Sequence, residues 1–340
     1  MARWVLHVDL DQFIAAVELL RHPELRDRPV IVGADGDPAK RGVVSTASYL
    51  AREYGVHSGM PLRTAAKRCP DAVFLAVDRA AYEAASRAVM ATLRGLDAVV
   101  EVMGWDEAFL AVETDDPEAF ARGIQRQVKA ATSLDCTVGI GGNKLQAKIA
   151  TGLGKPAGVF RLTSENWYKV LGDRPPDALW GIGGKTARRL AGLGIASVAS
   201  LAAADPAAMA REFGPVNGPW LVALARGIDT SPVTDEPYEP RSRGREVTYQ
   251  RDIADWDRVR AEVARIAGQV AGDLAAEGHI ANRIIVKVRY APFVTRTHGQ
   301  GLAEPTSAAA DIEAAAMAVL AEFAEHRPVR LLGVRAELAR

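Results

Sequence analysis

The sequence is poor in cysteine, lacks long hydrophobic runs and carries no net charge. Its 340 residues include two cysteines, Cys69 and Cys136. Two cysteines supply neither a disulfide framework nor the spacing of a metal site, so we expect a reducing, cytoplasmic environment. No apolar run approaches the roughly 20 residues of a membrane span, and the N-terminus lacks the basic and apolar segments of a signal peptide. These absences exclude an integral membrane protein.

The charge balance alone argues against a nucleic-acid partner. The chain has 42 Lys and Arg against 42 Asp and Glu, whereas phosphate binding normally leaves a basic surplus. The distribution is uneven, however. One basic group near the C-terminus is accompanied by a single acid, Glu246, and a second lies in a stretch without acids: Arg241, Arg243, Arg245 and Arg251, then Arg283, Lys287, Arg289 and Arg296.

A strand over 284–290 would separate basic from apolar side chains, because successive residues of a strand point to opposite faces. The two sets are Ile284, Val286 and Val288 on one face, and Arg283, Lys287 and Arg289 on the other. The basic face is either a track for phosphates or an ordinary solvated surface.

The length predicts two or three domains. A turn cluster at Gly172–Asp177 and a proline-rich, acidic stretch at Thr230–Pro240 divide the chain into about 1–165, 166–233 and 243–340. The last block predicts an antiparallel α+β sheet with two helices on one face. Its expected elements are strand Arg243–Tyr249, helix Trp256–Ala275, strands Ile284–Tyr290 and Thr295–Gly299, helix Ala308–Glu325 and strand Val329–Leu338.

Two acidic motifs follow apolar runs that are typical of buried strands. Val8-Asp9-Leu10-Asp11 ends the first run, and Gly104-Trp105-Asp106-Glu107 follows the second. Strand-end carboxylates that meet at one place repel one another unless cations lie among them, and hard oxygen ligands suit magnesium. Two such ions can activate a hydroxyl and stabilise the leaving oxygen of a phosphoryl transfer.

Each motif also has an interpretation without chemistry. Asp11 precedes a helical pattern that begins at Phe13, and Asp is a favourable N-cap. Asp106 and Glu107 lie at the tip of a predicted hairpin with arms Val99–Met103 and Ala108–Glu113, where acids are commonly only solvated.

The motifs resemble those of the Y-family DNA polymerases, and in particular the DinB (polymerase IV) branch. The opening motif continues through Gln12-Phe13-Ile14-Ala15-Ala16-Val17-Glu18, and further matches follow in the same order and spacing. They are Val44–Arg52, Gly55–Pro61, Val138-Gly139-Ile140, Asn143-Lys144, Ala147–Ala150 and Lys155-Pro156.

The resemblance implies an α+β multidomain, right-hand polymerase. It would have a palm (1–165) with small inserted fingers (about 20–76), a helix-hairpin-helix thumb (166–233), a linker (234–242) and a DNA-binding little-finger domain (243–340). The implied activity is template-directed, low-fidelity translesion synthesis without proofreading on primer-template DNA. The expected substrates are deoxynucleoside triphosphates, and the chain is expected to act as a monomer.

The resemblance also implies the site residues. Asp9, Asp106 and Glu107 would be catalytic and would hold two magnesium ions together with the Leu10 carbonyl, with manganese as an alternative ion. The implied nucleotide contacts are Phe13, Ile14, Thr46, Tyr49, Arg52 and Lys155, and the implied DNA contacts are Gly181, Gly183, Lys185, Arg188, Arg243, Arg245, Lys287 and Arg289. Taken alone, the Gly181-Ile182-Gly183 turn is equally consistent with an ordinary helix–helix connection.

Three features depart from the family pattern. Ile14 occupies the position of an aromatic residue that packs under the sugar, so we expect weak discrimination against ribonucleotides unless a backbone shift keeps this gate closed. Gly104 replaces a serine before the acidic pair. The C-terminus shows no clamp-binding motif, so recruitment by a sliding clamp is not expected.

Two other functions remain as alternatives. A non-catalytic, polymerase-like accessory protein would bind DNA without needing the three carboxylates. A nucleotide cyclase would share the two-metal palm but would have no use for a helix-hairpin-helix or a basic C-terminal domain.

Overall fold

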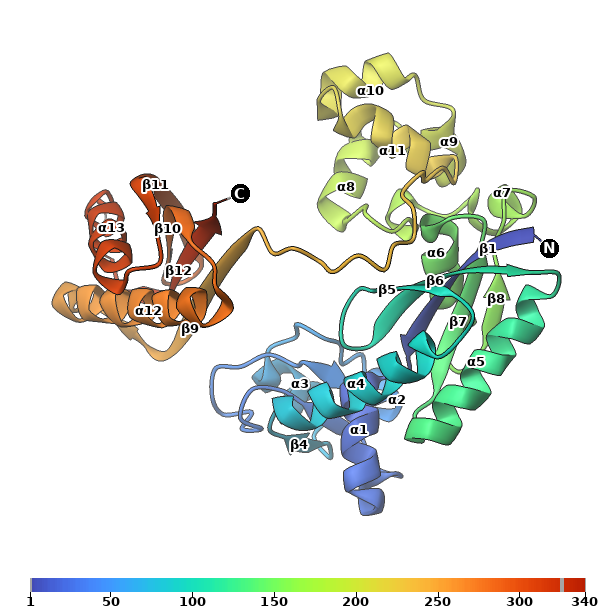
Figure 1. Ribbon diagram of the computed structural model, residues 1–340, viewed down its shortest axis with the longest axis horizontal. Helices are drawn as coiled ribbons and strands as arrows, with labels where there is room; N and C mark the ends of the chain where they lie inside the picture. The colour runs from blue at the N-terminus through green and yellow to red at the C-terminus, as the bar shows by residue number, and fades with distance from the viewer. Residues whose placement is uncertain (1, 325–326, 340) are drawn as a thin grey trace. The chain divides into compact units, whose positions relative to one another are not determined.

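The computed structural model describes residues 2–324 and 327–339 and is shown in Figure 1. Its contacts divide the chain into two compact units. The first comprises residues 1–37 and 42–236, and the second comprises residues 38–41 and 237–340.

A five-stranded sheet in the order β5-β6-β1-β7-β8 forms the centre of the first unit. The strands are β1 (Ala2–Leu10), β5 (Val99–Val102), β6 (Glu107–Thr114), β7 (Cys136–Gly141) and β8 (Val159–Arg161). Strand β1 pairs antiparallel with both β6 and β7, and β7 pairs parallel with β8. The predicted hairpin is confirmed, because β5 and β6 pair antiparallel within one residue of the expected bounds.

Helices cover both faces of this sheet. On one face, α1 (Phe13–Arg21), α4 (Arg79–Arg94) and α5 (Pro117–Thr132) enclose the apolar side chains of β1, β6 and β7. On the other face, α6 (Lys144–Gly154) packs on β7 and β1. Gly139 permits this close approach, because a Cβ there would lie 2.0 Å from the Ala147 carbonyl oxygen.

A small three-stranded sheet, in the order β3-β2-β4, is inserted between α1 and α4. It has its own core, which includes Ile31, Val44 and Leu62. Its elements are η1 (Pro23–Leu25), β2 (Val30–Val32), β3 (Thr46–Ala47), α2 (Tyr49–Glu53), α3 (Leu62–Arg68) and β4 (Val73–Leu75).

A group of short helices follows β8 and packs around buried Trp167 and Leu190 and against α6. Its elements are α7 (Trp167–Leu171), η2 (Pro176–Ala178), α8 (Gly184–Gly192), α9 (Val198–Ala202), α10 (Pro206–Phe213) and α11 (Asn217–Ala225). Gly181, before α8, has a φ of +98°, which side chains other than that of glycine rarely allow. A Cβ on Gly181 would also lie 2.9 Å from the Trp220 ring.

The second unit is an antiparallel sheet in the order β11-β10-β12-β9, with α12 and α13 packed on one face. The predicted α+β arrangement is therefore confirmed. The elements are β9 (Ser242–Ile253), α12 (Trp256–Glu277), β10 (Ala281–Tyr290), β11 (Val294–Thr306), α13 (Ala309–Ala321) and β12 (Val329–Leu338). Helix α13 ends before the predicted bound, Glu325, which lies outside the described residues.

The alternation predicted for 284–290 is also confirmed. Ile284, Val286 and Val288 are fully buried under the helices, whereas Arg283 and Lys287 face away from them. Within residues 2–324 and 327–339, no helix combines the length and hydropathy needed to cross a membrane.

Candidate active site

The sheet register brings the two acidic motifs together. Asp9, near the end of β1, pairs directly with Glu107, the first residue of β6. The Leu10 N–H donates to the Asp106 carbonyl at 2.9 Å, so Asp106 lies beside the same strand end. The expected meeting of the three carboxylates thus follows from one hairpin and one antiparallel pairing.

The three carboxylates differ in electrostatic environment. Burial and the charges of Asp9 and Glu107 raise the pKa of Asp106. The hydrogen bond from His7, assisted by the Lys148 ammonium, lowers the pKa of Glu107 to about 2. Asp106 therefore experiences an excess of negative charge that a cation would relieve.

Two lysines contact the acidic pair from the α6 side. Lys148 Nζ contacts Glu107 Oε2, and Lys155 Nζ, just beyond α6, contacts Asp9 Oδ1. These ammonium groups serve as internal counter-cations for Asp9 and Glu107. The role of Lys148 was missed by the sequence analysis, because it depends on how α6 packs against β1.

His7 is a second residue that the sequence analysis missed. It is fully buried, its Nδ1 lies 2.9 Å from Thr151 Oγ1, and its Nε2 lies 3.3 Å from Glu107 Oε2. Its signal in the sequence is strand alternation, which places residues 7 and 9 on the same face of β1. Burial is the largest effect on this imidazole and lowers its pKa.

The donor set fits hard divalent cations. Ligand atoms of His7, Asp9 and Glu107 lie within 4.8 Å of one another, and the two ammonium groups already act as stand-in cations. Carboxylate oxygens suit magnesium or manganese better than the His7 imidazole does. Asp9 and Glu107 are therefore suited to hold such ions. Asp106 is not part of this close group of ligand atoms, although the charges of Asp9 and Glu107 reach its carboxylate.

Asp11 is not the N-cap of α1, so that interpretation is wrong. The N-cap is Gln12, in the left-handed conformation and without a side-chain capping bond. Asp11 is instead 4% exposed and accepts hydrogen bonds from Tyr49, Thr137 and Ala157. Its partners come from distant parts of the chain, which local helix signals do not reveal.

The residues expected to bind the nucleotide lie on three elements. Phe13 is buried in the core of the five-stranded sheet, and Ile14, next to it on α1, is half-buried. Thr46 lies on β3 and Tyr49 begins α2. Arg52 is exposed on α2, donates from Nε to the Ala47 carbonyl at 3.0 Å, and places its guanidinium 5.0 Å from the Tyr49 ring centroid.

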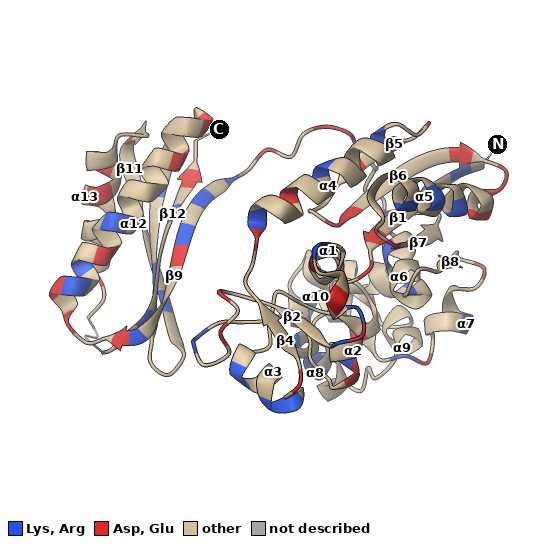
Figure 2. Cartoon of the chain, turned by 90° about the horizontal axis from the view of Figure 1, so that it is seen from below, with Lys and Arg blue, Asp and Glu red and all other residues tan. Residues whose placement is uncertain are grey.

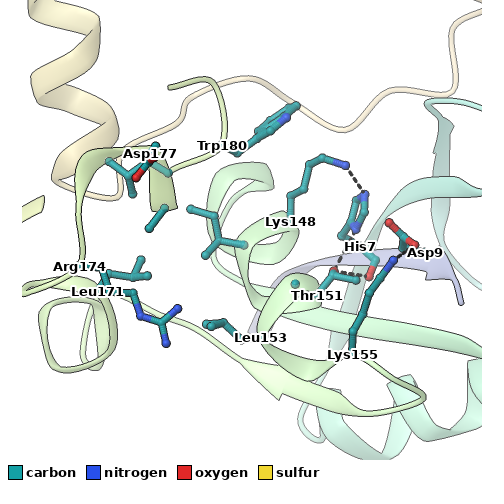
Figure 3. Close-up of a pocket in the computed structure, with 14 residues that line it drawn as sticks. His7, Asp9, Lys148, Thr151, Leu153, Lys155, Leu171, Arg174, Asp177 and Trp180 are labelled. Carbon is teal, nitrogen blue, oxygen red and sulfur yellow. Dashed lines mark hydrogen bonds and ion pairs between the residues drawn. The ribbon is translucent and has the colours of Figure 1, made fainter. Parts of the chain in front are cut away.

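Asp9 and the two lysines line a cleft of about 460 Å³. Figure 3 shows Lys148, Lys155, His7 and Asp9 on one side and Leu171 and Arg174 on the other. Trp180, 42% exposed, also lines the cleft, with Lys148 Nζ 5.5 Å from its ring centroid.

The expected DNA contacts of the first unit gather at one helix start. Gly183 is the N-cap of α8, and Lys185 and Arg188 are exposed on the helix. With Gly181 in the preceding turn, this hairpin presents backbone N–H groups and two positive side chains to solvent.

The structure divides the four basic residues expected in the second unit between two faces of its sheet. Lys287 and Arg289 lie on the face opposite the helices. Arg243 and Arg245 share the helix side with Val247, because Arg245 pairs with buried Val334. Residues 243, 245 and 247 are in phase on β9, so their side chains share one face of the strand.

Acidic side chains accompany these basic residues. Arg243 contacts Glu277, and Arg245 forms a bidentate ion pair with Asp273, with both distances 2.7 Å. The two acids lie on α12. On the open face, Lys287 lies 2.6 Å from Glu246. Figure 2 shows basic residues along β9 and acidic residues on α12 within this unit.

Comparison with protein families gives two matches. The impB/mucB/samB family matches residues 8–152, and the impB/mucB/samB family C-terminal domain matches residues 240–338. The first match includes Asp9, Asp106, Glu107 and Lys148, and it ends before Lys155.

Similar proteins match the chain over nearly its whole length. It is 50% identical to DNA polymerase IV 2 of Mycobacterium tuberculosis over 99% of this chain and 98% of that protein. It is 40% identical to DNA polymerase IV of Methanoculleus marisnigri over 98% of this chain and 94% of that protein.

Among solved structures, a Y-family DNA polymerase chimera of Dbh and Dpo4 matches with a TM-score of 0.86 at 26% identity, covering 98% of each chain. An insertion ternary complex of Dbh DNA polymerase matches with a TM-score of 0.67 at 26% identity, again covering 98% of each chain.

Proposed function

The chain belongs to the Y-family DNA polymerases, in the DNA polymerase IV (DinB) branch, and we propose that Asp9, Asp106 and Glu107 form its catalytic centre. It is a DNA-directed DNA polymerase of the translesion class, and its family uses divalent metal. The observation that carries the proposal is the register of Asp9 with Glu107, beside which Asp106 has a raised pKa.

We also propose the division into domains that is expected of this fold class. We assign the five-stranded sheet and its helices to the palm, the inserted three-stranded sheet to the fingers (about 20–76) and the short helices to the thumb (166–233). Residues 234–242 form the linker, and 243–340 form the little finger. Primer-template DNA and deoxynucleoside triphosphates are the substrates of this arrangement, and the chain acts as a monomer.

The carboxylates would hold two magnesium ions, with manganese as an alternative and the Leu10 carbonyl as a further ligand. Bound metal supplies activation of the primer 3′-hydroxyl and stabilisation of charge on the phosphates. Lys155 would leave Asp9 for the triphosphate when the nucleotide binds. The primer 3′-hydroxyl then gives its proton to solvent water, and its oxygen bonds to the α-phosphorus as the bond to pyrophosphate breaks. The charge of Lys155 offsets that of the departing pyrophosphate.

The fingers supply the remaining contacts to the nucleotide. Arg52 is exposed and stacked on Tyr49, so its charge is available to the triphosphate. Thr46, on the same small sheet, can donate a hydroxyl hydrogen bond. Phe13 supports Ile14 from the core, and Ile14 faces the sugar as an aliphatic gate that admits ribonucleotides.

Two surfaces would hold the DNA. The hairpin at Gly181 and Gly183, with Lys185 and Arg188, offers contacts to phosphates that do not depend on sequence. In the little finger, Lys287 and Arg289 lie on the open face of the sheet. Arg243 and Arg245 would contribute only after leaving Glu277 and Asp273.

Primer extension on a defined template tests the catalytic proposal. Asp106→Asn keeps the side-chain shape but removes one negative charge, so we expect the extension rate to fall by about 1,000-fold or more while primer-template binding is retained. Asp97→Asn, at an exposed acid of the same unit, is the matched control and should extend normally. A native protein that binds primer-template but never extends it would instead be a non-catalytic accessory protein.

A further inference from the structure

The catalytic proposal leaves unused a buried carboxylate two residues from Asp9. Asp11 is 4% exposed, and a buried carboxylate is costly unless its oxygens accept hydrogen bonds. Its Oδ1 accepts from the Tyr49 hydroxyl at 2.8 Å and the Thr137 hydroxyl at 2.9 Å, and its Oδ2 accepts from the Ala157 N–H at 2.7 Å. The charge is therefore held by three donors.

These donors come from three separate segments. Tyr49 begins α2 in the inserted small sheet, and Thr137 lies on β7. Ala157 follows Lys155 by two residues. Asp11 thus joins the segment that carries Arg52 to the segment that carries Lys155, the two cations proposed for the triphosphate.

The position of Tyr49 is fixed at two points. Its hydroxyl donates to Asp11, and its N–H donates to Gln12 Oε1 at 2.5 Å. A phenol has one proton to donate, so in this arrangement Tyr49 has none for a phosphate oxygen. Its ring instead carries Arg52, whose guanidinium lies 5.0 Å from the ring centroid.

On the other side, Asp11 holds the backbone just beyond Lys155. The Ala157 N–H donates to Asp11, and Ala157 has a left-handed φ of 51°. This bond fixes the direction in which the chain leaves Lys155. The ammonium of Lys155 in turn contacts Asp9.

We propose that Asp11 is a positioning residue that sets the two triphosphate cations relative to each other, Arg52 through Tyr49 and Lys155 through the Ala157 amide. The inference rests on the proposed nucleotide site. Asp11 touches neither substrate nor metal, so its loss affects nucleotide binding before it affects the chemical step.

Single-nucleotide insertion kinetics test this role. We expect Asp11→Asn to raise KM for the deoxynucleotide about tenfold and to change kcat by less than about threefold, because the amide cannot accept from all three donors. Tyr49→Phe should raise KM similarly. The KM of the double variant should be at most about twice that of the more affected single variant, because both changes break the same contact. Independent, multiplying effects would overturn the proposal.

Thr137→Val is the matched control. It removes another donor to the same carboxylate but touches neither proposed cation, so it should lower the thermal midpoint and leave KM unchanged. If Asp11→Asn behaves in the same way, lowering stability without changing KM, Asp11 is only structural and the proposal is wrong.

Hydrogen exchange of the Ala157 amide keeps the proposal testable if Asp11→Asn does not fold. In the nucleotide-free protein, Tyr49→Phe should loosen the Asp11 side chain, which Thr137 still holds, and speed exchange at Ala157 by about fivefold or more. A direct contact between Tyr49 and phosphate would not produce this change, and an unaltered exchange rate would overturn the proposal.

Arg52→Ala and Lys155→Ala separate this inference from the proposed nucleotide site. If neither variant raises KM, the nucleotide site itself is wrong, and the role of Asp11 falls with it. If both raise KM while the Asp11 and Tyr49 effects multiply, the nucleotide site stands and only the coupling through Asp11 fails.

Discussion

At the scale of single residues, Ile14 sets the expected sugar selectivity. It is half-buried against the palm core and follows Phe13, which is fixed within that core. A β-branched aliphatic side chain is shorter than the aromatic ring that the family resemblance leads us to expect at this position, and it has few rotamers with which to fill the space. We therefore expect this side chain to leave room for a ribose hydroxyl.

Ile14→Phe should close this gate. We expect the ratio of ribonucleotide to deoxynucleotide insertion efficiency to fall by about tenfold or more, with deoxynucleotide insertion nearly unchanged. The measurement is kcat/KM for matched ribo- and deoxynucleoside triphosphates on one template. Ile14→Leu, which conserves volume, should leave the ratio unchanged, and strict deoxynucleotide selection by the native chain would contradict the prediction.

The sequence predicted the acidic residues better than their neighbours. Asp9, Asp106 and Glu107 each follow an apolar strand pattern, so local periodicity is enough to bring them to strand ends. The roles of Asp11 and His7 depend on partners such as Thr137 and Thr151, which lie more than 120 residues away. Local helix signals made Asp11 an N-cap because they cannot report such contacts.

At the scale of elements, the seating of α6 on β7 controls where both lysines lie. Gly139 leaves room for the helix backbone, because a Cβ there would lie 2.0 Å from the Ala147 carbonyl oxygen and 2.3 Å from the Thr151 nitrogen. Backbone atoms cannot rotate away from such a clash. A side chain at this position must displace the helix.

Gly139→Ala should therefore lower the free energy of unfolding by about 3 kcal/mol or more, or prevent folding. Chemical denaturation monitored by circular dichroism measures the change. Gly152→Ala, on the exposed side of α6 with nothing within 4 Å of its Cβ, is the control. That variant should gain about 0.5–1 kcal/mol, and equal effects of the two changes would contradict the packing argument.

A buried contact also ties α1 to α4. The Tyr82 hydroxyl donates to Glu18 Oε1 at 2.6 Å, and both side chains are buried. Burial, assisted by the Glu18 carboxylate, raises the pKa of Tyr82 to about 12. The bond exists only while the phenol is protonated.

Tyr82→Phe should cost about 1–2 kcal/mol near pH 8, because Glu18 loses a partner. Because the folded-state pKa of Tyr82 lies above the usual value of 10, its hydrogen bond contributes fully to the free energy of unfolding below pH 10. That contribution is lost as the pH rises toward about 12. The stability difference between native and variant, measured by urea denaturation from pH 8 to 12, should shrink over that interval. A difference that stays constant would show that the phenolic proton is not involved.

At the scale of the whole molecule, charge distribution matters more than net charge. The chain has no net charge, and several of its arginines are paired with acids of the same unit. The sequence predicted the outward face of β10 correctly because alternation there is regular. It did not separate Arg243 and Arg245 from that face, because assigning a strand's face requires the register with β12.

The helix-hairpin-helix should account for a measurable part of the salt dependence of DNA binding. Replacing Lys185 and Arg188 together by alanine should reduce the slope of log affinity against log salt by about 1–2, equally for unrelated DNA sequences. Fluorescence anisotropy at several salt concentrations measures the slope. Lys169→Ala, an exposed charge on α7, is the control, and an equal effect from it would remove the hairpin from the interface.

The contacts of Lys148 and Lys155 with Glu107 and Asp9 have a consequence for handling the enzyme. Because the chain supplies these two lysines as counter-ions, the protein does not need a dissolved cation to keep Asp9 and Glu107 close together in the folded state. Chelators would then inhibit the polymerase without unfolding it. Activity would return on simple addition of a divalent salt, without any refolding step.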